Sequence, residues 1–511
     1  MNLKNLKPQM TPYNLNRFHF LVLVTWQFSI FFAVQQIFPI FLVYVPEWRC
    51  LSKGIQNQSF PDSWTEYSRK CEVHQNCPAS QLEIKNVYFS AAMEFGWICT
   101  DNGKYMISLT SMVQFFGVLC GTIFYGSLAD KYGRKPIAIL VLSSGLSSLF
   151  ASGFVDSAWQ LLIARYLVGL ANGGTIVVVC TFVMELLLPQ QRMALRAYTN
   201  WGNARLISTV ISLLLPHWRH ASVACSLFAL PALVVILVLF PESPPWLFHQ
   251  NRHSDFQSCK KYIAKLGGVP FENTVEDLTS TPVKLRELLK NSKMRTMVGI
   301  LCVMWFTASV SSYTNDLNSA AISGDFFVNQ ILLASFIAIS KVILGLTDLF
   351  YPRFNRRSLH QYSQIAVIVC FLGVSILTTV EYKGVLLLLL NIFGTISIEW
   401  TWDACYLSAV ESMPTDVRGS AIGCCSLVAR IGALMSPALT LTCDLWSPTP
   451  YMFVTVFGII NLAISHKLLP DTKGTDLCQV KLKLHKTQER FRESNTKTTL
   501  IEISETQENG Q

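Results

Sequence analysis

Charged residues are scarce in this chain of 511 residues, and their scarcity sets its class. Only 14% of the residues are Asp, Glu, Lys or Arg, whereas 51% are hydrophobic, and the mean hydropathy is positive. Soluble proteins carry about 25% charged residues. The composition therefore excludes an ordinary soluble protein and predicts an all-α polytopic membrane protein that crosses the lipid bilayer many times.

The chain also lacks the motifs of several enzyme and pump classes. It has no G-x-x-x-x-G-K-[ST] phosphate-binding loop, so an ATP-driven pump has no support. No His and Cys spacing typical of a metal site stands out, and neither does a pairing of nucleophile and base. We therefore expect no cofactor and no enzymatic activity. Transport driven by gradients or by exchange is the economical interpretation that remains.

Twelve apolar stretches approach the ~20 residues that a membrane helix needs. They lie at roughly 20–45, 104–127, 136–154, 159–184, 196–215, 221–240, 294–315, 326–348, 359–380, 384–410, 419–441 and 450–469. The first stretch is too long for the core of a signal peptide and lacks a small-residue cleavage site. We therefore expect it to be retained as a helix.

The net charge of +9 does not indicate a nucleic-acid partner, because the basic residues are distributed by side. The turns after the even-numbered stretches hold most of the Lys and Arg, whereas the odd-numbered turns carry mainly acids such as Asp316. The sequence from His217 to His220 is an exception. By the positive-inside rule, both termini and all even turns are predicted to be cytoplasmic.

The long loop at 46–103 is predicted to lie outside the cell. It holds Cys50, Cys71, Cys77 and Cys99, and four cysteines in an oxidising space suggest two disulfides, with three pairings open. The same loop contains the sequon Asn57-Gln-Ser59, which makes Asn57 the candidate glycosylation site.

Two motifs recur about 220 residues further along the chain, at the ends of apolar stretches. The segment from Asp130 to Lys135 has a degraded copy in the segment from Asp348 to Arg357. The segment from Glu185 to Arg192 matches the segment from Glu411 to Arg418, with a Pro between the two charges in each case. The near-constant offset predicts two pseudo-symmetric six-helix halves, as in many secondary transporters. The expected divisions are a cytoplasmic N-terminus at 1–19, a first half at 20–248, a cytoplasmic linker at 249–293, a second half at 294–470 and a disordered cytoplasmic tail at 471–511.

The turn after the second stretch has the composition of a gate between the halves. Gly133 permits a tight turn, and Asp130 can face the positive N-terminus of a neighbouring helix. Arg134 and Lys135 can hold acidic groups of the opposite half. The simpler alternative is a basic turn that only fixes the topology. The candidate gating residues are Gly126, Asp130, Gly133, Arg134, Lys135, Glu185, Arg192, Glu411 and Arg418.

These segments resemble a known superfamily. The ten residues from Gly126 to Lys135 are similar to the G-x-L-x-D-x-x-G-R-K pattern of the major facilitator superfamily. Pro241-Glu-Ser-Pro-Pro-Trp-Leu247 resembles the P-E-S-P-R-W-L segment of its organic ion transporter family, with Pro245 replacing the basic residue. The segment from Glu411 to Arg418 resembles that family's E-x-x-P-T-x-x-R, whereas Pro352 stands where the second-half turn expects Gly. The resemblance implies an alternating-access carrier of organic cations, anions or carnitine.

Ionisable residues within the apolar stretches mark candidate substrate contacts, because charge is costly inside a membrane. Arg430 lies about 11 residues into its stretch, near the midplane. Lys341 is deep in the eighth stretch, and Glu399 and Asp403 lie in the tenth; Arg205, in the fifth, is a weaker case. Anion transporters of the resembled family carry Lys and Arg in the eighth and eleventh helices, which implies that Lys341 and Arg430 bind an anion. A Lys341–Glu399 ion pair is the alternative, and it would leave Arg430 as the main unpaired cation.

Aromatic residues complete the candidate site. Trp305 and Tyr313 recur on one face of the seventh stretch, and Trp402 lies in the tenth. Aromatic walls suit flat, amphipathic organic ions, whereas packing between helices is the alternative for each residue.

Together these features predict a secondary active transporter that moves organic ions, with organic anions favoured, across the plasma membrane. The expected partners are a small organic ion, the lipid bilayer and, as the resemblance implies, an exchanged intracellular dicarboxylate. A carrier of cations or of carnitine-like zwitterions is one alternative. A receptor-like membrane protein that does not transport is another.

Overall fold

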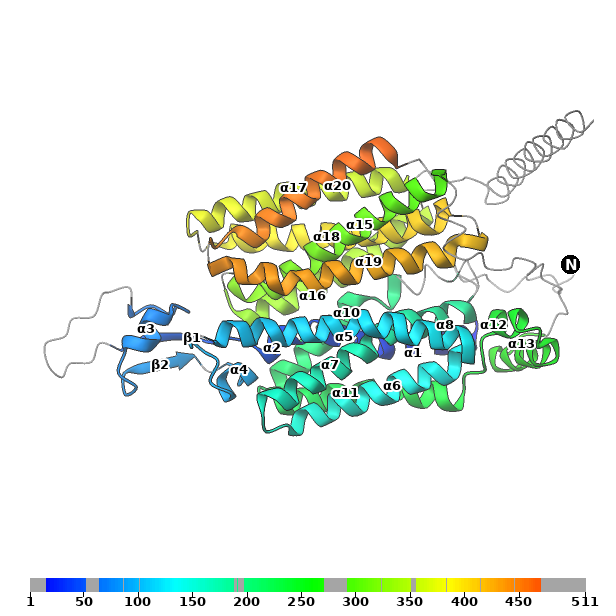
Figure 1. Cartoon of the computed structure of the whole chain (residues 1–511), viewed down its shortest axis with the longest axis horizontal. Helices are drawn as coiled ribbons and strands as arrows, with labels where there is room; N and C mark the ends of the chain where they lie inside the picture. The colour runs from blue at the N-terminus through cyan, green and yellow to red at the C-terminus, as the bar shows by residue number, and fades with distance from the viewer. Residues whose placement is uncertain are drawn as a thin grey trace, which may run out of the picture.

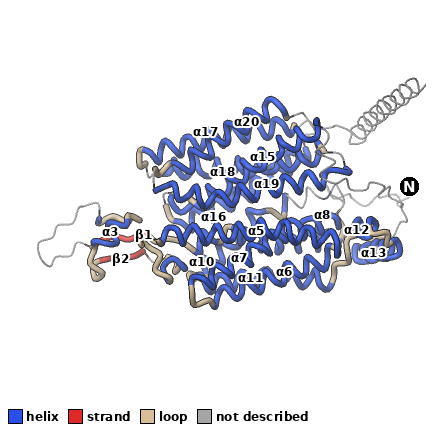
Figure 2. Tube along the Cα trace, viewed as in Figure 1, coloured by secondary structure: helices blue, strands red, loops and turns tan. Residues whose placement is uncertain are grey.

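The structure is a computed structural model dominated by long helices that run side by side (Figures 1 and 2). It describes residues 15–51, 64–85, 87–100, 102–187, 191, 197–270, 292–322, 324–350, 355–382, 384–413, 415–444 and 446–469. The expected glycosylation site Asn57, the gating candidate Arg192, Pro352 and the tail at 471–511 lie outside these ranges.

The first half of the bundle contains residues 17–249. Its main helical elements are α1 (Arg17–Ala33, continued by η1, Val34–Gln36), α5 (Gly103–Tyr132), α6 (Arg134–Ala151), α7 (Ala158–Gly174) with the π-helix η4 (Thr175–Val179) and α8 (Cys180–Leu186), α10 (Trp201–Leu214) and α11 (Trp218–Val238). Short elements are α2 (Pro39–Leu42), η3 (Ser152–Phe154) and α12 (Pro244–His249).

The second half contains residues 292–468. Its helices are α15 (Ser292–Leu317), α16 (Phe326–Phe350), α17 (Arg356–Thr379), α18 (Val385–Ser412), α19 (Thr415–Leu441) and α20 (Thr449–Leu468), with the short turns η6 (Ser319–Ala321) and η7 (Thr442–Asp444). In Figure 1 this half lies above the first, and α10 and α16 lie where the halves meet.

Eleven helices in the described part of the chain are long and apolar enough to cross a membrane. The fifth expected stretch forms α10, which has 14 residues and begins at the Asn200 cap. At about 1.5 Å per residue, α10 is shorter than the ~30 Å hydrocarbon core. With α10 in fifth place, the helices follow the order of the twelve predicted stretches.

The two ends of the bundle differ. At one end, here called the loop end, lie β1 (Glu47–Cys50), α3 (Cys71–Asn76), β2 (Leu82–Lys85) and α4 (Ala91–Glu94). At the other, the linker end, lie α12 and α13 (His253–Gly267), as Figure 1 shows. β1 and β2 pair antiparallel, with Glu47 opposite Lys85.

Two disulfides tie the loop together. Cys50 bonds to Cys77 and Cys71 bonds to Cys99, which selects one of the three pairings that the sequence left open. The two bonds close segments of nearly equal length, because they join cysteines at sequence separations of 27 and 28. Loops of this length lose enough unfolded-state entropy on closure to stabilise a small hairpin that has little core of its own.

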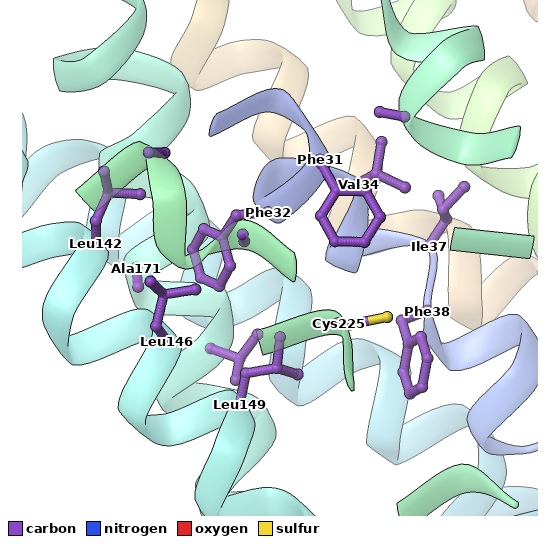
Figure 3. Close-up of a cluster of buried hydrophobic side chains, with 14 of the residues drawn as sticks. Phe31, Phe32, Val34, Ile37, Phe38, Leu142, Leu146, Leu149, Ala171 and Cys225 are labelled. Atoms are coloured by element: carbon purple, nitrogen blue, oxygen red, sulfur yellow. The ribbon is translucent and has the colours of Figure 1, made fainter. Parts of the chain in front are cut away.

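The core of the first half lies where α1 meets α6, α7 and α11. Figure 3 shows the rings of Phe31, Phe32 and Phe38 among side chains of α6 and α7. A Cβ at Gly145 of α6 would clash with the Phe32 ring and with the Ala171 side chain, so the glycine leaves room for this aromatic side chain. Close packing of this kind is what holds helices together in lipid, where apolar burial gives little driving force.

Candidate functional site

A cavity of about 260 Å³ lies between the two halves. It is lined by α1 and the α7–α8 region from the first half, by α10 at the interface, and by α15, α16, α18 and α19 from the second half. The residues that line it are Trp26, Ile30, Ala33, Ile176, Cys180, Met184, Thr199, Asn200, Trp201, Ser312, Tyr313, Asp316, Lys341, Glu399, Trp402, Asp403, Tyr406 and Arg430. A cavity shared by both halves changes shape whenever the halves rock against each other.

Arg430 of α19 lines the cavity and is 7% exposed. Its Nη1 donates to the Gln36 side-chain oxygen of η1 at 3.4 Å, and the Tyr313 hydroxyl donates to the same oxygen at 2.8 Å. Arg430 forms no ion pair with any described residue, and its Nε has no hydrogen-bond partner there. Arg430 is thus a buried cation at the cavity wall with spare donors.

Lys341 of α16 has two acidic partners. Its Nζ lies 2.9 Å from Glu399 Oε2 and 2.7 Å from Asp403 Oδ2, and it also donates to the Glu399 carbonyl oxygen at 3.0 Å. All three side chains are at most 11% exposed. The Lys341–Glu399 pair was the alternative that the sequence offered, and Asp403 adds a second carboxylate to it. The cluster therefore carries a net charge of −1 when all three groups are ionised.

A second buried ion pair joins the two halves directly. Arg205 of α10 donates to Asp316 Oδ1 of α15 at 2.5 Å and to Gln330 Oε1 of α16 at 2.8 Å. The expectation that Asp316 lies in an external turn is wrong, because it is a residue of α15 and is only 3% exposed. The ion pair with Arg205 of the first half stabilises Asp316 in this buried position.

The aromatic candidates separate into two groups. Tyr313 and Trp402 line the cavity, together with Tyr406, which the sequence had not singled out. Trp305 is not among the described residues that line it. Instead, Trp305 packs edge-to-face against Trp402, with ring centroids 5.7 Å apart, so it supports the wall from behind. This contact favours the packing interpretation for Trp305.

The gate turn of the first half is held by acids of its own half. Arg134 pairs with Asp130 at 2.6 Å, and its Nε lies 3.6 Å from Glu185. The expected contact with the opposite half is not formed by Arg134 with the described residues. The helix N-terminus that Asp130 was expected to face is capped instead by Glu242, whose Oε1 accepts from the backbone N–H groups of Arg134 and Lys135, each at 3.0 Å.

This capping explains Gly133. Its φ is +110°, and a Cβ there would lie 2.6 Å from a Glu242 carboxylate oxygen. Gly126 is less constrained, because a Cβ there would meet Val177 at an ordinary contact distance of 3.5 Å. Glu242 belongs to the Pro241–Leu247 segment noted in the sequence, where nothing indicated that it caps α6.

The second half repeats the arrangement. Arg356, the first residue of α17, pairs with Glu411 near the end of α18 at 2.9 Å, as Arg134 approaches Glu185 in the first half. The duplicated motifs thus occupy equivalent places. Arg418 donates to the Met413 carbonyl oxygen at 3.2 Å through Nη2, which places it at the α18–α19 turn.

Comparison with known proteins places the chain in a family. Residues 74–483 match the sugar (and other) transporter family. An uncharacterised protein of Caenorhabditis elegans is 37% identical over 480 residues, which cover 91% of this chain and 94% of that protein. Solute carrier family 22 member 7 of Mus musculus is 27% identical over 78% of this chain and 75% of its own length. Organic cation/carnitine transporter 4 of Arabidopsis thaliana is 24% identical over 91% and 88%.

The fold has solved counterparts as well. The xylose transporter of E. coli, a protein of the major facilitator superfamily, superimposes with a TM-score of 0.63 at 14% identity, over 91% of this chain and 99% of that one. The relatives whose names state a function are transporters, not enzymes. This chain therefore belongs to the sugar (and other) transporter family of the major facilitator superfamily, and it resembles the organic ion transporters within it.

Proposed function

We propose that this protein moves organic ions across the plasma membrane by alternating access, and that the cavity between its halves is the substrate site. Two features support this proposal. The cavity takes residues from both halves, and the same Arg–Glu pair recurs at the linker end of each half. Two similar bodies that share a central polar cavity can expose it to each side of a membrane in turn.

The anionic group of the substrate binds at Arg430 in this proposal. The single observation that carries it is a buried guanidinium at the cavity wall that forms no ion pair with any described residue. Burial of such a cation is costly without a counter-ion, and a carboxylate or sulfate would supply one. The planar guanidinium matches either group with two parallel hydrogen bonds.

Zwitterionic substrates are the second candidate, and the cluster around Lys341 favours them. Lys341 is no longer a free anion site, because Glu399 and Asp403 neutralise it and leave one negative charge in excess. A substrate with one carboxylate and one cationic group could satisfy both Arg430 and this cluster. One relative carries carnitine in its name, and carnitine has such a pair of groups.

Uptake of labelled organic anions, zwitterions and cations in expressing cells tests the proposal. We expect uptake of anions or zwitterions, with the Michaelis constant raised roughly tenfold to a hundredfold in Arg430→Ala, since a charge-assisted hydrogen bond contributes about 1.5–3 kcal/mol. Arg430→Lys should recover only part of the loss, because a point charge cannot form two parallel bonds. Arg295→Ala, at an exposed position of α15, is the matched control.

Three outcomes would contradict parts of this proposal. Anion uptake by Arg430→Ala at the parent affinity would refute the assignment of Arg430. Uptake of cations alone would move the protein to the cation carriers. No uptake of any ion by protein at the cell surface would favour a receptor-like role.

The topology and the exchange partner complete the proposal. The loop end faces outward, the linker end and both termini face the cytoplasm, and an intracellular dicarboxylate leaves as the substrate enters. Excess Lys and Arg in the even turns supports this orientation. Preloading cells with a dicarboxylate should accelerate uptake if exchange operates, whereas an unchanged rate would argue for gradient-driven transport.

A further inference from the structure

The contacts that join the two halves include a series on the loop-end side of the cavity. Phe41 of the first half lies against Phe326 and Phe327 of α16, with ring centroids 5.6 and 6.0 Å apart. Arg69 of the loop donates to the carbonyl oxygen of Ala320 in η6. Among the described residues, the Arg205–Asp316 pair adds an ion pair to these contacts.

The position of the pair along its helices fits a closure. Asp316 is one residue from the end of α15, and Gln330 is the fifth residue of α16, so both lie next to the α15–α16 turn at the loop end. Lys341, one of the polar residues deeper in the cavity, lies 11 residues further along α16. A contact between the cavity and the loop-end surface must break before the cavity can open to that side.

We propose that Arg205, Asp316 and Gln330 form a latch between the halves, closed in this conformation and open whenever the cavity faces the loop end. The inference rests on the alternating access proposed above, and it assigns these residues a role separate from binding the substrate's anionic group at Arg430. Asp316 also lines the cavity. The charge of a molecule bound in the cavity therefore acts on Asp316 of the latch.

The cost of an unpaired buried charge determines which conformation a substitution in the latch favours. With the latch closed, Arg205 and Asp316 are 2% and 3% exposed, so removal of one leaves the other as a buried, uncompensated charge. With the latch open, water can hydrate the remaining charge. A single neutral substitution therefore penalises the closed conformation alone and shifts the population towards the open one. Removal of both charges together lifts the penalty.

Cysteine labelling measures this shift without requiring transport. Ser312 lines the cavity one turn before Asp316, so Ser312→Cys reports access from the loop end to a membrane-impermeant maleimide added outside cells. Asp316→Asn and Arg205→Gln should each accelerate labelling by about tenfold or more, where tenfold corresponds to about 1.4 kcal/mol. The double variant should label at nearly the parent rate.

Controls separate the latch from general damage. Asp156→Cys, in an exposed turn at the same end, should label at one rate in every background. The same latch variants with Ser312 retained measure the labelling of the native cysteines. If a charge variant does not reach the surface, Gln330→Ala leaves the Arg205–Asp316 charges in place. It removes the bond from Arg205 and the bond that Gln330 donates to Ser319, and it should give a smaller acceleration in the same direction.

Two results would overturn the latch. Either single variant labelling Ser312→Cys at the parent rate would show that the pair does not hold the halves together. A double variant that labels as fast as the product of the two single effects would show independent structural damage. Uptake measured on the same cells decides the transport proposal separately, because labelling of a carrier that moves no ion would still report the latch.

Discussion

Removal of the Lys341 ammonium should destabilise the protein far more than removal of either of its acidic partners. In Lys341→Met, Glu399 and Asp403 both lose the cation that lies 2.9 and 2.7 Å from them. In Glu399→Gln, the pair of Lys341 with Asp403 remains and its charges balance. The asymmetry follows from one ammonium serving two carboxylates.

The magnitude follows from the burial. Breaking a buried pair by removing one partner costs about 3–5 kcal/mol, and two like charges left together add to that cost. Glu399→Gln keeps a hydrogen-bonding amide in place, so we expect a loss of about 1 kcal/mol. The exposed fractions of at most 11% leave little room for water to hydrate the carboxylates once the ammonium is removed.

Thermal unfolding of the purified protein in detergent checks the order of stabilities. Lys341→Met should lower the apparent melting temperature by several degrees, and Glu399→Gln should lower it only slightly. The double variant Lys341→Met/Glu399→Gln should recover part of the loss, because Asp403 still lacks the ammonium. The triple variant with Asp403→Asn should recover most of it. Equal losses in Lys341→Met and Glu399→Gln would refute the reasoning.

Three further outcomes are expected. Glycosidase treatment should increase the gel mobility of the mature protein, and Asn57→Gln should abolish that increase; a parent protein with no such shift would contradict an external loop. Asp130→Asn should slow transport while surface expression persists, because the Asp130 side chain is 73% exposed and an exposed pair with Arg134 contributes only about 0.2–1 kcal/mol to folding; an unchanged rate would remove Asp130 from the gate. Burial of Glu94 opposes its ionisation, but hydrogen bonds from Arg219 and Trp218 outweigh burial and lower the pKa of this carboxyl. The stability that Glu94 contributes should thus be complete at neutral pH and disappear as the pH falls through the lowered pKa, and a Glu94→Gln variant whose melting temperature follows the parent's at every pH would contradict this.

The sequence predicted the helices well because each membrane segment must satisfy its own backbone hydrogen bonds. Composition and length then suffice to locate a helix, whatever its neighbours. Two predicted stretches differ from the structure. The stretch at 20–45 runs past Gln36, where α1 and η1 end, and the stretch at 196–215 includes residues before the Asn200 cap of α10. A capping side chain determines where a helix begins, and hydropathy carries no information about capping.

The ion pairs between side chains were harder to predict than the positions of the helices. Lys341 and Glu399 could be paired from their similar depth, and Asp403 shares a helical face with Glu399 four residues earlier, which is a signal that could have been used. Arg205 and Asp316 are 111 residues apart in different halves. Nothing in either segment records how the halves are set against each other, so their pairing required the structure.

The charges at the cavity have a consequence for the energy source of the protein. Arg430, Lys341 and Arg205 bring three positive charges to the cavity and its latch, and Glu399, Asp403 and Asp316 bring three negative ones. In their ordinary ionised states the fixed charges cancel. A membrane potential does work only on net charge that moves through it, about 2.3 kcal/mol per charge for 100 mV. The empty carrier, and the carrier loaded with a zwitterion, would thus reorient without regard to voltage, whereas a bound monoanion would make the loaded step electrogenic.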